Sequence, residues 1–415
     1  MMMSWFRDMD ASGRRTFWAC FGGYALDAMD VHLYAFVAPV LILLWGMSNA
    51  EAGILASVTL IASSLGGWAA GLLADRIGRI RTLQITVLWF SFFAFLSGLT
   101  WDFGSLAVTR GLQGLGFGGE WTTSAVLMAE VVTPQVRGRA LGFIQSAWAI
   151  GWACAAITAT TLLSVLPPEI AWRAVFLAGL VPAAFVLVIR GRIPESALFR
   201  QARHTAPVSP YAIFSAPYSG ATVRATFLAF GAHGGYYSLT TWLPLLLRTE
   251  RGMTIIASGS YYLTLAAGSL LGYWTGAFAS DALGRRPTFI LAATGAIACV
   301  LVATTAPLTA GQMIAFAFPL GFCASSIYAG LGAQFAELYP TPIRGSGQGF
   351  CFNAGRGFAA MFPALVGFAS VDNGLSLSIG LLASLAFGFV IVAALLLPET
   401  NGRALRTGLG GENDT

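Results

Sequence analysis

The chain has 415 residues, of which 56% are hydrophobic and only 10% are charged. Soluble domains carry about 25% charged residues, so this composition excludes an ordinary soluble protein and indicates that lipid surrounds most of the chain. The net charge of +5 does not indicate a nucleic-acid partner, because the arginines recur at short turns between apolar segments instead of gathering on one face or in one run.

Taken in order, the apolar segments are long enough for twelve membrane-spanning helices, each of which needs about 20 apolar residues. We expect spans at 16–45, 51–74, 82–101, 105–129, 139–164, 171–190, 221–247, 255–280, 287–306, 310–336, 345–369 and 374–397. The polar, proline-containing stretch 191–220 follows the sixth span. We interpret it as a cytoplasmic linker between an N-terminal bundle, 1–190, and a C-terminal bundle with its tail, 221–415.

Arginine placement predicts the orientation of these spans. With the N-terminus inside, the inner segments hold about 18 of the 23 basic residues. The outer loops hold three, Arg173, Arg248 and Arg251. Cytoplasmic loops are enriched in arginine, so we expect both termini in the cytoplasm and the chain in the cell's inner membrane.

Three short motifs occur twice, at an offset of about 206 residues. They are Asp75–Gly78–Arg79 with Asp281–Gly284–Arg285, Glu130–Arg137 with Glu337–Arg344, and Pro194-Glu195-Ser196 with Pro398-Glu399-Thr400. A near-constant offset over three unrelated motifs indicates a duplicated chain with two parallel halves.

The charges of the first two motifs are candidates for a gate that holds the inner side shut. This set comprises Asp75, Arg79, Glu130, Arg137, Asp281, Arg285, Glu337 and Arg344. Membrane topology alone is the alternative, but it accounts for the arginines and not for the recurring acids.

Five charges fall deep inside predicted spans: Asp27, Asp30, Arg110, Glu120 and Arg356. A charge near the bilayer centre costs at least ~2.5–3.5 kcal/mol, so each needs a reason. At 1.5 Å per helical residue, Asp27 and Arg356 lie roughly 18 Å and Glu120 roughly 15–18 Å from the inner surface. Charges at one depth on three helices, from both halves, predict a shared cavity.

The deep carboxylates, Asp27, Asp30 and Glu120, are candidates for proton coupling, since a carboxyl group in a low-dielectric cavity binds a proton more readily than one in water. A structural ion pair or hydrogen bond is the alternative. Arg356 keeps its charge and matches a carboxylate with its planar fork. We expect it to bind a substrate carboxylate with Asn353 as an added donor; a fixed ion pair with an acid of the other half is the alternative.

Further candidates for the substrate site come from polar and aromatic side chains within the predicted spans. They are Gln145, Trp148, Trp152, His233, Tyr236 and Tyr237. For each alone, ordinary packing or hydrogen bonding inside the bundle is the competing interpretation. His32 is treated in the same way, with proton relay as the less favoured role.

The stretch from Gly71 to Arg81 resembles the loop 2–3 motif of the major facilitator superfamily, Gly-x-x-x-Asp-Arg-x-Gly-Arg-Arg. Ile80 replaces the last basic residue of the motif, and Arg81 follows it. Leu26-Asp27-Ala28-Met29-Asp30 is similar to the first helix of aromatic-acid and sialate proton symporters. The stretch from Arg110 to Glu120 and Asn353-Ala-Gly-Arg356 look like their fourth and eleventh helices. The resemblance implies that Asp27 and Asp30 carry protonation and that Arg356 binds the substrate carboxylate.

The resulting expectation is an all-α membrane protein with two six-helix bundles related by a pseudo-two-fold axis. We expect a monomeric, proton-coupled symporter that imports a small organic acid anion, such as an aromatic acid, a sialic acid or a short monocarboxylate, by alternating access. The proton is the coupling ion and no other cofactor is expected. Because Pro398-Glu-Thr-Asn-Gly-Arg403 is similar to the tail motif of sugar porters, a neutral sugar or polyol carrier stays open, as does a drug or metabolite antiporter. An enzyme is not expected, since catalytic, metal-binding and phosphate-binding motifs are not found.

Overall fold

The computed structural model describes residues 4–47, 49–180, 184, 193–202, 209–253 and 255–406. These residues form helices and connecting turns, with no strand among them. Seven helices in the described part of the chain meet length and apolarity criteria for crossing a membrane.

The helices of the N-terminal half follow one another with short connections. They are α1 (Ser4–Asp8), α2 (Ala11–Trp45), α3 (Asn49–Ile77), α4 (Arg79–Ser97), α5 (Phe103–Val131), α6 (Arg137–Gln145), α7 (Ala147–Val165) and α8 (Pro168–Leu177). Part of the predicted sixth span, and part of the predicted boundary at 190/191, lies outside the described residues.

The C-terminal half repeats this pattern after a connection that contains α10 (Ala197–Ala202) and the 3₁₀ turn η3 (Pro210–Phe214). Its helices are α11 (Ser219–Thr249), α12 (Ile255–Ala282), α13 (Arg285–Thr305), α14 (Ala310–Leu338), α15 (Thr341–Ala359), α16 (Phe362–Asn373) and α17 (Leu375–Leu396).

The fifth and eleventh predicted spans are each divided in two, which the sequence analysis did not anticipate. The first break lies at Ser146, whose hydroxyl donates to the carbonyl of Phe143 at 2.7 Å. The second lies between α15 and α16, where Pro363 occupies the first turn of the new helix, a position at which its missing N–H costs no hydrogen bond. The two breaks lie in corresponding spans of the two halves but not at corresponding residues, and the first of them borders the cavity.

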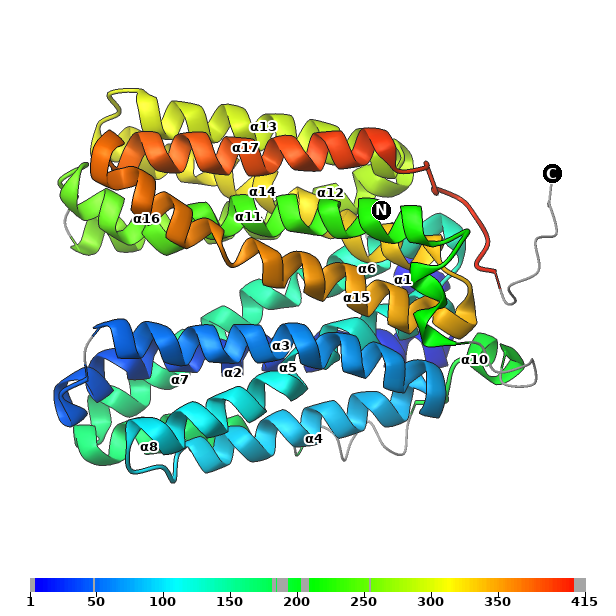
Figure 1. Ribbon diagram of the computed structural model, residues 1–415, viewed down its shortest axis with the longest axis horizontal. Helices are drawn as coiled ribbons and strands as arrows, with labels where there is room; N and C mark the ends of the chain where they lie inside the picture. The colour runs from blue at the N-terminus through cyan, green and yellow to red at the C-terminus, as the bar shows by residue number, and fades with distance from the viewer. Residues whose placement is uncertain are drawn as a thin grey trace.

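Figure 1 shows two bundles, with α2–α5, α7 and α8 below, α11–α14, α16 and α17 above, and α6 and α15 between them. Contacts between them run mainly along α3 with α15 and along α6 with α12 and α14. The end that carries α1, α10 and the C-terminal residues 397–406, on the right in Figure 1, is called the terminus end below.

The turns with the repeated Asp–Gly–Arg motif have the same geometry in both halves. Gly78 joins α3 to α4 with φ of 107°, and Gly284 joins α12 to α13 with φ of 104°. This region favours glycine, because a Cβ atom would clash with the backbone. The same turn chemistry is therefore built twice.

The repeated Pro-Glu-Ser/Thr motif caps the helix that follows each turn. Glu399 accepts hydrogen bonds from the backbone N–H groups of Arg285 and Arg286, both at 3.0 Å, and of two residues of its own segment. Glu195 does the same for Ile80 at 3.1 Å. A carboxylate satisfies the free N–H groups at a helix start and complements its dipole. Partial burial raises the pKa of Glu399, but the four N–H donors outweigh it and hold the pKa below its ordinary value.

Candidate functional site

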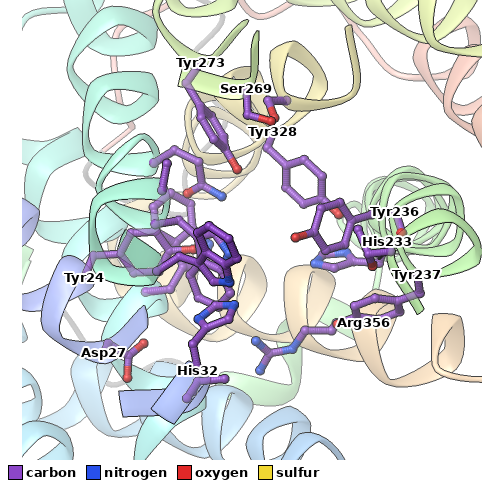
Figure 2. A pocket seen from close by; sticks show the side chains of 18 of the residues that line it. Tyr24, Asp27, His32, His233, Tyr236, Tyr237, Ser269, Tyr273, Tyr328 and Arg356 are labelled. Carbon is purple, nitrogen blue, oxygen red and sulfur yellow. Dashed lines mark hydrogen bonds between the residues drawn. The ribbon is translucent and has the colours of Figure 1, made fainter. Parts of the chain in front are cut away.

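A cavity of about 560 Å³ lies between the two halves. Figure 2 shows labelled side chains from both halves pointing into it, with Tyr24, Asp27 and His32 on one wall and His233, Tyr236, Tyr237 and Arg356 on the other. Its lining comprises Tyr24, Asp27, Val31, His32, Leu60, Phe117, Trp121, Gln145, Trp148, Ala149, Trp152, His233, Tyr236, Tyr237, Thr240, Tyr262, Leu265, Ala266, Ser269, Tyr273, Ser325, Tyr328, Phe352 and Arg356. The volume lies in the range of ligand pockets, about 300–1,000 Å³.

Arg356 is the cation of the cavity. Its Nη2 donates to Ser63 Oγ and to Asn353 Oδ1, both at 2.8 Å. Its guanidinium carbon lies 5.1 Å from the ring centre of Phe117, and its Nε is buried without a partner. Among the described residues no carboxylate forms an ion pair with it. A buried guanidinium that has donors to spare and no counter-ion is a site for an anion.

Asp27 is the carboxylate of the cavity, on the opposite wall from Arg356 in Figure 2. The residue is 1% exposed, and neither carboxylate oxygen has a hydrogen-bond partner among the described residues. An ionised carboxylate left without partners in a low-dielectric site is costly, and a proton removes that cost. The arrangement allows Asp27 to alternate between a neutral and a charged form.

Asp30 lies in a separate buried cluster and does not line the cavity. It accepts a hydrogen bond from Gln113, whose other amide atom accepts from Arg110 at 2.7 Å. Arg110 also lies 4.9 Å from the ring centre of Tyr34. Arg110, which the sequence analysis left without a role, is thus linked to Asp30 through an amide.

Glu120 also lies outside the cavity lining, although its estimated depth had placed it at the level of Asp27 and Arg356. One carboxylate oxygen accepts from Ser124 in the same helix at 2.8 Å, while the other is buried without a partner. The neighbouring residue Trp121 takes the place at the wall, packed on Tyr24 with ring centres 5.0 Å apart. Depth along a helix does not determine which face of the helix meets the cavity.

Six other predicted substrate-site residues line the cavity: Gln145, Trp148, Trp152, His233, Tyr236 and Tyr237. Asn353 does not, but it orients Arg356 through its oxygen and donates to Thr122 of the other half at 3.1 Å. A single aromatic or small polar residue in an apolar span carries no local signal of its neighbours. Six further lining residues were therefore not predicted: Tyr24, Phe117, Trp121, Tyr273, Ser325 and Tyr328.

The eight predicted gate residues form a buried network at the terminus end. Two ion pairs cross between the halves, Arg137–Glu337 at 2.8 Å and Arg344–Glu130 at 2.6 Å. Within each half the same acids also bind Arg79 and Arg285, each pair at 2.9 Å.

The two aspartates of the network cap helices of the opposite half. Asp75 accepts from the backbone N–H groups of Gly345 and Ser346 at 3.0 and 2.7 Å. Asp281 accepts from those of Gly138 and Arg139, both at 2.9 Å. The aspartates of the repeated Asp–Gly–Arg turns thus each bind backbone N–H groups of the opposite half.

From this network a seam of small residues runs along α3 and α15 to the cavity. A Cβ atom built on Gly345 would lie 2.7 Å from the carbonyl oxygen of Gly71, and one on Gly349 2.9 Å from that of Gly67. The seam ends at the bond between Arg356 and Ser63. The cavity is therefore closed toward the terminus end.

Within the described ranges, no three His, Cys, Asp or Glu side chains lie together as metal ligands would.

Comparisons with known proteins identify the family of this chain. The model of the Major Facilitator Superfamily matches residues 20–310, and that described as "Sugar (and other) transporter" matches residues 236–407. The chain is 39% identical over 409 residues to a probable 4-methylmuconolactone transporter of Cupriavidus pinatubonensis (strain JMP 134 / LMG 1197), covering 97% of this chain and 95% of that protein.

More distant relatives include the sialic acid transporter NanX of Escherichia coli (strain K12), 23% identical with 94% of this chain and 96% of that protein covered. A gallate transporter of Pseudomonas putida is 28% identical, with 93% and 91% covered. The fold matches that of the proton:xylose symporter XylE with a TM-score of 0.79 at 18% identity, covering 95% of this chain and 98% of that one. The predicted fold class and resemblance are confirmed: this multi-pass membrane protein belongs to the Major Facilitator Superfamily and is a transporter, not an enzyme.

Proposed function

We propose that the protein is a proton-coupled symporter that imports a small organic acid anion. The observation that carries this proposal is the cavity's unpaired Arg356, which faces an equally unpaired Asp27. A carboxylate cargo supplies the counter-ion that the guanidinium lacks. The relatives named for 4-methylmuconolactone, sialic acid and gallate support an organic acid as the cargo class.

The proton enters the proposal through charge balance. With Asp27 ionised, Arg356 already has an opposite charge in the same cavity, and a cargo anion adds a net negative charge. With Asp27 protonated, one cargo carboxylate on Arg356 leaves the cavity neutral. Moving an uncompensated charge through a closed, low-dielectric intermediate is costly, so the loaded carrier reorients most readily with one proton and one carboxylate.

Asp30 and Glu120 are the further candidates for the coupling proton. Asp30 is linked to Arg110 through Gln113, so a proton on Asp30 alters the position of this bridge between α2 and α5. Glu120 has one free buried oxygen. Variants at the three acids separate these candidates.

The conformation fits an early step of import. With both termini in the cytoplasm of a cell whose inner membrane holds the protein, the closed terminus end faces inward and the cavity faces out. The cross-half ion pairs of the terminus end, Arg137–Glu337 and Arg344–Glu130, then form the inner gate. Cargo and proton enter together, the gate pairs separate, and the cavity opens to the cytoplasm. One chain supplies the whole cavity, so the monomer is the proposed working unit.

The test uses purified protein in proteoliposomes. An imposed inward proton gradient is expected to drive uptake of a labelled organic acid above equilibrium. Arg356→Ala should remove anion binding, whereas Asp27→Asn or Asp30→Asn should abolish gradient-driven accumulation and leave exchange of bound anion intact. Retained anion affinity in Arg356→Ala contradicts the anchor role. Undiminished accumulation in Asp27→Asn, in Asp30→Asn and in a third variant, Glu120→Gln, contradicts proton coupling by these groups.

A neutral sugar or polyol is the second candidate, favoured by the match of residues 236–407 to the sugar-transporter model. Sugars bind through neutral hydrogen bonds, so their transport should tolerate the loss of Arg356. Competition of labelled organic acid uptake by unlabelled acids and by sugars distinguishes the two cargo classes.

A further inference from the structure

We propose that His32, His233 and Gln145 form a set of hydrogen-bond acceptors that selects cargo bearing hydroxyl or N–H donors in addition to its carboxylate. This inference rests on the proposed function and adds to it a chemical requirement on the part of the cargo away from Arg356. All three side chains line the cavity.

The two histidines present the same tautomer to the cavity. His32 Nδ1 lies 2.6 Å from the carbonyl oxygen of Ala28, and His233 Nδ1 lies 2.9 Å from that of Ala229. A carbonyl oxygen only accepts, so in each ring Nδ1 carries the hydrogen and donates it. In the neutral ring Nε2 is then an acceptor, and among the described residues nothing donates to either Nε2.

A second proton on His233 is disfavoured by its neighbour. Figure 2 shows His233 on the same wall as Arg356, so an imidazolium there would face a guanidinium that never loses its charge. The ring is also enclosed by Tyr328 and Phe352, with ring centres 5.3 and 4.9 Å away. A neutral, accepting ring fits these surroundings.

Gln145 supplies the third acceptor, from α6. It is the last residue of α6, and it is 2% exposed with its Oε1 unpaired. The next residue, Ser146, accepts from Trp274 of α12 at 3.2 Å, which holds the end of α6 against the other half. The helix break that the sequence did not predict thus fixes Gln145 at the wall.

The acceptors come from three elements, α2, α6 and α11, and all three line the same cavity as Arg356. Cargo that fills this space displaces water from them. Cargo with donors restores the lost hydrogen bonds, whereas cargo with only ether or carbonyl oxygens leaves buried acceptors unpaired. The expected preference for a hydroxylated acid over its unsubstituted parent is about tenfold.

The experiment measures binding of five acids to the purified full chain by calorimetry: benzoate, 3- and 4-hydroxybenzoate, and 3- and 4-methoxybenzoate. A methoxy group keeps the oxygen and removes the donor, so it separates donor recognition from ring size. At least one hydroxybenzoate should bind about tenfold more tightly than benzoate, and its methoxy counterpart should not.

The variants His32→Phe, His233→Phe and Gln145→Met remove the acceptors and keep side-chain bulk. At least one should bring the preference for the hydroxylated acid close to one while benzoate is still bound. Thr240→Val is the matched control, because Thr240 also lines the cavity but its hydroxyl already donates to the carbonyl of Tyr236 at 2.9 Å; its preference should equal that of the unmodified protein.

Equal affinity for hydroxy and methoxy acids overturns this inference and leaves the proposed function standing. So does a parallel loss of benzoate binding in the histidine variants, since that result makes the rings cations or packing elements instead of acceptors. If none of the five acids binds, this inference fails, whereas the proposed function stands or falls with organic acid uptake in the proteoliposome assay.

Discussion

The buried ion pair between Arg137 and Glu337 should control how firmly the terminus end stays closed. The substitution Arg137→Met removes two bonds to the C-terminal half, to Glu337 Oε1 at 2.8 Å and to the carbonyl oxygen of Arg403 at 3.1 Å. Glu337 keeps its two bonds to Arg285, so no buried carboxylate is left unpaired. The loss is therefore that of a hydrogen bond to a charged group, about 1.5–3 kcal/mol.

That energy corresponds to a shift of about tenfold to 150-fold toward conformations that are open at the terminus end. The control is Arg139→Met on the same helix. Arg139 pairs with Asp281 of the C-terminal half at 3.3 Å. The side chain of Arg139 is 29% exposed, against 2% for that of Arg137. Because Arg139 is partly exposed and Asp281 keeps its bonds to Arg285 and to the backbone N–H of Gly138, the control should shift the population less than Arg137→Met does.

The assay is a distance measurement by electron spin resonance between labels at Arg76→Cys and Ala282→Cys. Both positions are exposed and lie near the terminus ends of α3 and α12, one in each half. Cys154, the exposed natural cysteine, is first replaced by alanine. Arg137→Met should add a population at longer distance, well above that in Arg139→Met. An unchanged distribution in Arg137→Met, or an equal shift in both variants, refutes the reasoning that burial determines the strength of the gate.

Three further outcomes are expected. Gly71→Ala should abolish transport at normal protein yield, because the added Cβ meets the backbone carbonyl of Gly345 across the contact of α3 with α15. Gly311→Ala is the control and should transport normally, since the space around Gly311 is open. Equal uptake by the two variants contradicts close contact of α3 and α15. Asn353→Ala should weaken anion binding about tenfold, as measured by calorimetric titration, because Arg356 loses the oxygen that orients it. Unchanged affinity means that the bond to Ser63 is enough to orient Arg356. Glu399→Gln should reduce the fall in unfolding temperature between pH 7 and pH 4. The pKa of Glu399 is lower in the folded protein than its unfolded-state value of about 4.5, so the ionised carboxylate stabilises the fold above that pH. This stabilisation is lost as the pH falls below the unfolded-state pKa and through the folded-state pKa. A fall identical to that of the unmodified protein excludes Glu399 as a source of acid sensitivity.

The sequence by itself determined the architecture of this protein. Long apolar runs can satisfy their backbone hydrogen bonds in lipid only as helices. The offset of about 206 residues between Asp75 and Asp281 predicted two equivalent halves. It also singled out Asp27 and Arg356, because an ionised group in an apolar span is costly enough to need a function. These signals are local, or repeat along the chain, and so can be read without coordinates.

The tertiary structure decided which of the deep charges share a space. Asp27 and Arg356 line the cavity, whereas Glu120 points elsewhere from the same depth and Asp30 pairs with Gln113. The ion-pair partners of the gate could not be predicted from the sequence either, since Arg137 and Glu337 are 200 residues apart. The same holds for the helix break at Ser146, which places Gln145 at the cavity wall. Helix rotation and the contact between the halves depend on packing summed over many side chains, and no local pattern encodes that sum.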